Sequence, residues 1–154
     1  MDCREQALKL ISFKDRTEKE LRRRLEEKEY NEGEIEETIE FLKNYGYVDD
    51  ARYARRFAAD SVKLKSHGPG RIKTELLRKG IDRDTIEIVL EEMETDPREE
   101  LEAAMERRFS SADLGNPKER SRVFGYFARR GYSPHDIWGV INSRSSFKDV
   151  DFEE

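Results

Sequence analysis

Apolar residues recur three or four positions apart along most of the chain, a spacing that places them on one face of a helix. One six-residue segment occurs three times, at Leu25–Tyr30, Leu76–Ile81 and Phe127–Tyr132, and each copy begins 51 positions after the previous one. A fixed period of this length is typical of repeat proteins. We therefore predict one apolar framework that is used three times, with the first residue of each segment buried in its own repeat. The same offset aligns Leu21 with Ile72 and Val123, Ile35 with Ile86 and Ile137, and Ile39 with Leu90 and Ile141.

Helix-terminating residues divide the first repeat into three helices. The first is expected from about residue 4 to residue 13. Thr17 and Glu20 have the spacing of a capping box, in which each side chain bonds to the other's backbone N–H, so a second helix should start near Glu18. A third helix is expected at about residues 32–45, because Gly46 suits a left-handed turn just after a helix.

The other two repeats show the same punctuation. Asp49-Asp50 suits the start of a helix that runs to about Lys65, Pro69 opens a second helix that ends at Gly80, and Asp82 caps a third. In the third repeat, Asx-Pro or Ser-Pro pairs mark all three helix starts, at Asp96-Pro97, Asn116-Pro117 and Ser133-Pro134.

The predicted fold is therefore all-α, with three tandem three-helix repeats in an elongated, curved arrangement. The repeats occupy residues 1–48, 49–94 and 95–143. Residues 144–154 are predicted to form a frayed acidic tail.

One framework position departs from the repeat. Gly80 and Gly131 each follow the second helix of their repeats, whereas the equivalent residue of the first repeat is Glu29. A residue other than glycine in a left-handed turn costs on the order of 1 kcal/mol. We therefore expect the turn at Glu29 to be built differently.

The balance of acidic and basic residues indicates what kind of partner the protein binds. Charged residues make up 42% of the chain and hydrophobic residues 35%, a polar load that suits a thin architecture better than one thick core. The net charge is −5, and only the middle repeat avoids a negative balance. Non-specific DNA binding needs several cations without competing acids. A protein partner, or a composite surface of protein and DNA, fits this balance better.

Candidate catalytic and metal-binding residues are few. Cys3 is the only cysteine, which excludes an intramolecular disulfide. His67 and His135 lie in predicted helix-start turns and are interpreted as structural or exposed, and Asp49-Asp50 as helix-capping acids rather than metal ligands. With no phosphate-binding glycine loop, we predict no enzyme activity, no cofactor and no metal. No stretch resembles a signal peptide or a membrane span, so we expect a cytoplasmic protein that does not contact the membrane.

Basic residues are the candidate binding residues. Two basic pairs fall on the same framework position at the end of a second helix, where cations also suit the helix dipole. Stacked repeats would present these pairs along one side of the molecule. The competing interpretation is that they are only solvated helix ends. The candidate set is Arg22, Arg23, Arg71, Lys73, Arg78, Lys79, Arg129 and Arg130.

Two segments of the middle repeat, Tyr47–Phe57 and Lys65–Ile81, resemble the signature of the RecX recombination regulators. Thr17–Leu25 and Phe127–Tyr132 resemble the family's first and third units, and the resemblance covers about residues 5–142. It implies tandem three-helix units that bind the groove of the RecA filament, with single- or double-stranded DNA within the filament as a further contact. It also implies inhibition of strand exchange, of the filament's ATPase and of its coprotease activity, and hence modulation of DNA repair by homologous recombination and of the SOS response.

Two other function classes stay open. A DNA-binding module of the helix-turn-helix type predicts duplex binding without RecA and a steep salt dependence. A helical scaffold for an unrelated partner predicts binding to neither. Titration against ATP-loaded RecA on single-stranded DNA, with bare DNA and free RecA as controls, separates the three.

Overall fold

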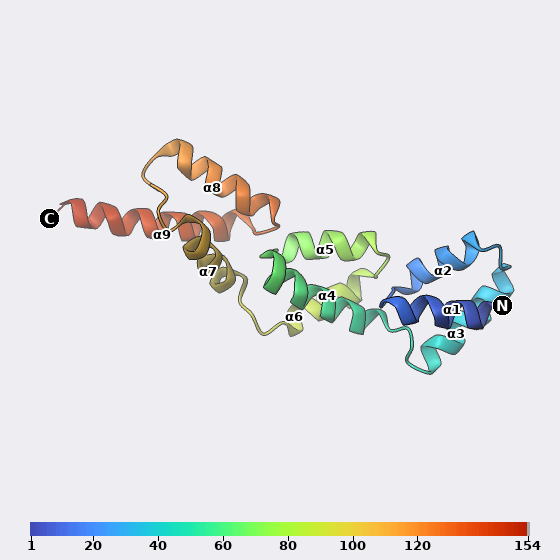
Figure 1. Ribbon diagram of the computed structural model, residues 1–154. Coiled ribbons are helices and arrows are strands. Elements are labelled where there is room, and N and C mark those ends of the chain that lie inside the picture. Colours follow the sequence, from blue (N-terminus) through green and yellow to red (C-terminus); the bar gives the residue numbers. More distant parts are fainter. Residues whose placement is uncertain (154) are drawn as a thin grey trace. The chain divides into compact units, whose positions relative to one another are not determined.

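The computed structural model describes residues 1–153 of the chain, with side chains described through residue 145, and this part is helical without strands (Figure 1). The predicted all-α class is confirmed. The helices group in threes, which we name the first repeat (α1 to α3), the middle repeat (α4 to α6) and the third repeat (α7 to α9). Their bounds are α1 Cys3–Phe13, α2 Glu18–Glu27, α3 Glu32–Asn44, α4 Asp50–Lys65, α5 Pro69–Arg78, α6 Arg83–Glu92, α7 Pro97–Phe109, α8 Pro117–Arg129 and α9 Pro134–Glu153.

The helices begin where the capping residues predict. The Thr17 hydroxyl accepts a hydrogen bond from the Glu20 N–H, and prolines occupy the first position of α5, α7, α8 and α9. Only half of the predicted capping box forms, because the Glu20 carboxylate accepts instead from Arg16, at 2.9 Å. The local signals therefore locate the helix starts, although one predicted side-chain partner differs.

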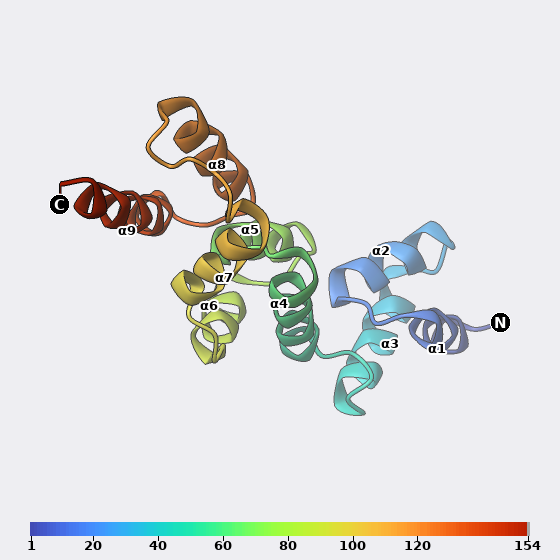
Figure 2. The same ribbon diagram turned by 60° about the vertical axis from the view of Figure 1, so that its left-hand side comes forward.

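The first repeat has its own apolar core. Helices α1, α2 and α3 contact one another, as the turned view shows (Figure 2). Leu21 and Leu25 of α2 meet Ile35, Ile39 and Leu42 of α3, and all five side chains are almost completely buried. Each such side chain contributes roughly 1.5 to 3 kcal/mol when it is removed from water. The apolar stripe predicted from the period therefore faces inward.

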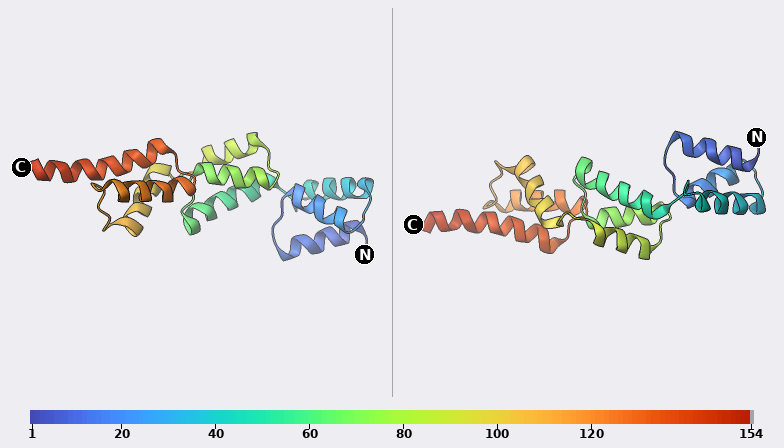
Figure 3. Two further views of the ribbon diagram at one scale, coloured as in Figure 1. Left: turned by 90° about the horizontal axis from the view of Figure 1, so that it is seen from above. Right: turned by 90° about the horizontal axis from the view of Figure 1, so that it is seen from below.

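The third repeat has a second core, which is richer in aromatic residues. Helix α9 lies against both α7 and α8, as the views from above and below also show (Figure 3). Phe127 is fully buried, and the Phe109 ring meets it nearly edge-on, with centroids 5.7 Å apart. Leu101, Val123 and Ile137 complete the centre of this core. Edge-to-face rings contribute about 0.5 to 1.5 kcal/mol beyond their buried area.

The chain divides into two compact units. One unit holds Met1–Ala58 with Glu75–Glu91, and the other holds Ala59–Thr74 with the chain from Glu92 onward. Helices α4 and α5 therefore contribute residues to both units. Leu76 of α5 is fully buried, as predicted.

All three repeats have a left-handed turn at the equivalent position after the second helix. Gly80 and Gly131 have φ angles of 90° and 92°, and Glu29 adopts the same conformation with φ 67°. The prediction that the turn at Glu29 would be built differently is wrong. Its N–H donates to the Glu26 carbonyl at 2.9 Å, and the next N–H donates to the Leu25 carbonyl at 3.3 Å, as in the other two repeats. These hydrogen bonds offset the cost of the left-handed backbone.

The C-terminal segment continues α9. The backbone is helical through Glu153, whereas the sequence predicted a frayed tail over residues 144–154. Glu154, and the side chains of residues 146–154, lie outside the described residues. His67 is buried and His135 is exposed, in agreement with their interpretation as structural or exposed residues.

Candidate functional site

The second helices of successive repeats are joined at equivalent positions. In one unit, the Thr17 hydroxyl at the start of α2 donates to the Lys79 carbonyl at 2.9 Å. In the other, the Gly68 N–H at the start of α5 donates to the Arg130 carbonyl at 2.7 Å. Donors and acceptors are each 51 positions apart. The backbone of the predicted basic pairs therefore holds the contact between neighbouring repeats.

Gly80 and Gly131, which follow the residues with these carbonyls, are needed for two reasons: their backbone angles, and the close approach of another repeat. A Cβ atom at Gly131 would overlap the backbone of Arg71, and one at Gly80 would overlap the side chain of Lys19. The equivalent side chain of the first repeat, Glu29, is exposed. A side chain is tolerated at Glu29 because it extends into solvent and, in the described chain, is not packed against another repeat.

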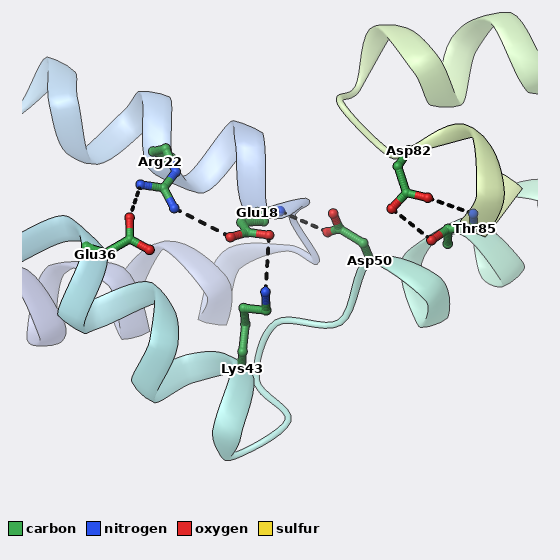
Figure 4. Close-up of polar contacts among 7 residues, drawn as sticks. All are labelled: Glu18, Arg22, Glu36, Lys43, Asp50, Asp82 and Thr85. Carbon is green, nitrogen blue, oxygen red and sulfur yellow. Dashed lines mark hydrogen bonds and ion pairs between the residues drawn. The ribbon is translucent and has the colours of Figure 1, made fainter. Parts of the chain in front are cut away.

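Asp49 and Asp50 have separate structural roles. Asp49 accepts from the Arg52 N–H and caps α4. Asp50 accepts from the Glu18 N–H at 2.9 Å, so it links the start of α4 to the start of α2 (Figure 4). Burial raises the pKa of the Asp50 carboxyl, with the backbone hydrogen bond from Glu18 acting in the opposite direction. Among the described residues no cluster of three or more His, Cys, Asp or Glu side chains could hold a metal ion.

In the middle and third repeats, a cation at the end of the second helix lies over an aromatic ring. The Lys79 ammonium lies 5.4 Å from the ring centre of Phe57 and 5.9 Å from that of Tyr53. The Arg130 guanidinium lies 4.1 Å from the ring centre of Tyr126. These distances allow cation–π attraction, which fixes the charges without neutralising them.

Arg22, in contrast, is neutralised within the first repeat. It donates to Glu36 at 2.8 Å and approaches Glu18 at 3.5 Å, while Lys43 also pairs with Glu18 (Figure 4). The hydrogen bond from Arg22 to Glu36 raises the pKa of Arg22 above its usual value and lowers that of Glu36. Arg23, the next residue, is exposed.

The remaining candidates differ in how they are held. Arg78 and Arg129 are exposed, and Lys73 is half-buried. Arg71 is drawn into the junction, where its guanidinium donates to the Arg129 carbonyl at 3.3 Å. The eight candidates therefore fall into two sets: Arg22, Arg23, Arg78 and Lys79 in the unit of the first repeat, and Arg71, Lys73, Arg129 and Arg130 in the unit of the third.

Sequence reasoning missed a basic hollow in the third repeat. Arg107 and Arg108 at the end of α7 and Arg122 of α8 line it together with the predicted Arg129. Its volume is about 560 Å³. The positions of Arg122 and Arg129 on one helix were a signal in the sequence, but their meeting with the end of α7 depends on tertiary packing.

None of the helices in the described chain is long and apolar enough to cross a membrane.

Two family models and several relatives match the chain. The model described as the RecX first three-helix domain matches residues 3–42, and that of the RecX second three-helix domain matches residues 49–90. The regulatory protein RecX of Clostridium beijerinckii is 35% identical over 147 residues, which cover 92% of this chain and 67% of the relative. That of Trichlorobacter lovleyi is 38% identical over 136 residues, which cover 85% of this chain and 88% of the relative.

A solved structure has the same fold. The crystal structure of RecX from Lactobacillus salivarius superposes with a TM-score of 0.78 at 25% identity, over 92% of this chain and 93% of that one. The sequence resemblance, the family models and the three-helix units agree along most of the chain. The chain therefore belongs to the RecX family of regulatory proteins.

Proposed function

We propose that this protein is a non-enzymatic regulator that binds the RecA nucleoprotein filament and inhibits its recombinase, ATPase and coprotease activities. The binding residues are the basic residues at the ends of α5 and α8, with Arg71 and Lys73 beside them and Arg23 on α2. Arg22 would contribute only by exchanging its Glu36 partner for the filament. Through this inhibition it modulates DNA repair and the SOS response.

One observation supports this surface most directly. Lys79 and Arg130 occupy the same framework position, and each holds its charge over an aromatic ring of its own repeat. Their backbone carbonyls are used by the repeat junction, so the helix ends are fixed in place. Neither cation has a carboxylate partner among the described residues, so each charge is available to an external anionic surface, and little side-chain entropy is lost when it binds.

The test is inhibition of ATP hydrolysis by RecA assembled on single-stranded DNA. Replacing Arg78 and Lys79 with Gln should leave the fold intact, because Arg78 is exposed and the half-buried Lys79 loses only a weak cation–π contact. Each lost contact contributes up to about 1 kcal/mol, so the concentration for half-inhibition should rise by roughly 3- to 30-fold. Reversing Arg129 and Arg130 to Glu should add to the defect if both repeats contact one filament.

The matched control replaces Lys9 and Arg83 with Gln, because both side chains are exposed and the change in net charge is the same. Bare DNA and free RecA serve as binding controls. If the control and the Arg78/Lys79 variant inhibit RecA equally well, these residues are solvated helix ends and the proposal for this surface fails. Binding to duplex DNA without RecA, or to neither partner, would instead favour the two other function classes.

A further inference from the structure

The arginine hollow of the third repeat shares Arg129 with the end of α8, but its other arginines lie outside the helix ends described above. We define it by Arg107, Arg108, Arg122 and Arg129, which surround a space of about 560 Å³ between the end of α7 and one face of α8. Within the part of the chain whose side chains are described, Glu119 is the only acidic residue that lines it. Four cations and one carboxylate give a local charge of about +3 in a chain whose net charge is −5. The hollow is therefore a basic site within an acidic protein.

The one carboxylate in the hollow is already engaged. Glu119 accepts a hydrogen bond from the Asp113 N–H at 2.7 Å, which ties the loop after α7 to α8. Its other oxygen lies 3.9 Å from Arg122, too far for a strong hydrogen bond. Arg107 also donates to the Ser66 hydroxyl at 3.4 Å. Among the described residues, no carboxylate therefore forms a close ion pair with an arginine of the hollow.

Aromatic rings position two of the four arginines. The Arg108 guanidinium lies 4.7 Å from the ring centre of Tyr126, and that of Arg122 lies 5.4 Å from the ring centre of Phe109. Stacking on a ring leaves the edge of a guanidinium free to bond two oxygens of one anion. The site is thus partly organised before a ligand arrives.

We propose that the arginine hollow binds the phosphodiester backbone of single-stranded DNA. The inference rests on the proposed function, since the RecA filament would present this strand, and it names a second contact besides the helix ends. Cations arranged in a concave groove match a charged backbone.

The lining favours a nucleic-acid backbone over an acidic peptide. Arginine clusters also recognise phosphorylated or acidic peptide motifs, but an extended or helical peptide is held in addition by backbone hydrogen bonds or apolar pockets. Here Phe109 is buried, and Tyr126 carries arginines at 4.7 and 4.1 Å, so the hollow offers no free aromatic face. Without such a face the bases have nothing to stack on. Binding should therefore be independent of base sequence and strongly dependent on salt.

The experiment measures fluorescence anisotropy of a fluorescein-labelled oligothymidylate of about 15 nucleotides, a length within the range of known single-strand sites. At about 0.1 M salt each phosphate contact contributes roughly fivefold to the affinity for a single strand. Replacing Arg108 and Arg122 with Gln should weaken binding roughly 25-fold and reduce the slope of log K against log salt by about 1.4. An oligoadenylate of equal length should show the same loss.

The Lys9/Arg83 variant is again the matched control and should bind the oligonucleotide like wild type. Far-UV circular dichroism and thermal unfolding verify that each variant folds. If the double variant fails to fold, Arg107→Gln tests the same point with an expected loss of roughly fivefold, because Arg107 is exposed and its long hydrogen bond to Ser66 contributes little to folding.

Three results would overturn the inference: no measurable binding of wild type at this salt, unchanged binding by the variant, or an effect on labelled poly-glutamate but not on oligothymidylate. The last would assign the hollow to an acidic peptide. Failure here is distinguishable from failure of the proposed function, because this assay contains no RecA. A protein that binds DNA through the hollow but does not inhibit RecA would refute only the proposed function.

Discussion

Replacing Gly131 with alanine should destabilise the contact between the middle and third repeats. Gly131 has a φ angle of 92°, and a Cβ atom there would overlap the Arg71 backbone. Two backbone hydrogen bonds cross this contact, from the Gly68 N–H to the Arg130 carbonyl at 2.7 Å and from the Gly70 N–H to the Gly131 carbonyl at 2.9 Å. The substitution therefore combines backbone strain with the loss of a junction.

The magnitude follows from these terms. A left-handed residue other than glycine costs roughly 1 to 2 kcal/mol, and each of the two hydrogen bonds contributes about 0.5 to 1.5 kcal/mol. Gly131→Ala should lower the free energy of unfolding by about 2 to 5 kcal/mol. Gly46→Ala is the matched control, because its φ is 74° and nothing lies within 4 Å of the added Cβ. It should lose only the backbone part, about 1 to 2 kcal/mol.

A reverse substitution tests the same reasoning. Glu29 already adopts φ 67° and is exposed. Glu29→Gly removes the left-handed penalty, while the added flexibility of the unfolded chain costs about 0.4 to 1 kcal/mol. Glu29→Gly should therefore raise the free energy of unfolding by up to about 1 kcal/mol.

The assay is urea unfolding followed by far-UV circular dichroism, combined with hydrogen exchange of the Gly68 amide. That amide should lose protection in Gly131→Ala and keep it in Gly46→Ala, since only the first substitution opens the junction. Equal urea midpoints for the two alanine variants, together with a Gly68 amide that stays protected in both, would refute the close-approach argument.

Two predictions concern titratable groups. Burial raises the pKa of Tyr132 to about 12, and its hydroxyl has no hydrogen-bond partner among the described residues. Stability due to the neutral phenol should be complete below pH about 10 and lost as pH rises through about 12, and phenolate absorbance can follow this titration. Tyr132→Phe should be neutral or should stabilise the fold by about 1 kcal/mol, because it removes an unpaired buried hydroxyl. A large destabilisation by this substitution would contradict the prediction. Burial also raises the pKa of Asp50 above its usual value. At neutral pH the ionised carboxyl therefore destabilises the folded protein relative to the unfolded protein. Asp50→Asn keeps an acceptor for the Glu18 N–H and should unfold at an equal or higher urea concentration than wild type at pH 7. This gain should be lost below pH about 4, where Asp50 of the wild type is protonated in both the folded and the unfolded protein. If the variant unfolds at a clearly lower urea concentration at pH 7, the charge of Asp50 stabilises the fold.

Most helix boundaries could be predicted from the sequence because their signals are local. Thr17, Pro69 and Pro134 act within one helical turn of their own position, so neighbouring residues alone reveal them. The 51-residue offset then carries each assignment to the other repeats. Leu25 and Phe127 are buried for the same reason, since each belongs to an apolar stripe that is complete within its own repeat.

Only the tertiary structure showed why Glu29 departs from the repeat. From the sequence, glycine at this position could be understood only through its backbone angle, and that reasoning predicted a different turn at Glu29. The turn is the same. The difference lies in the neighbours, because Lys19 approaches Gly80 and Arg71 approaches Gly131 from more than fifty residues away in the chain.

The same distinction applies to the charged residues. The sequence identified both Arg22 and Arg129 as candidates, yet Glu36 neutralises the first, and the second lines a hollow beside Arg108 and Arg122. Spacing along a helix determines which side chains share a face. Whether a cation is neutralised, stacked on a ring or left open to an anion depends on groups brought within a few ångströms by packing between helices, and those neighbours are remote in the sequence.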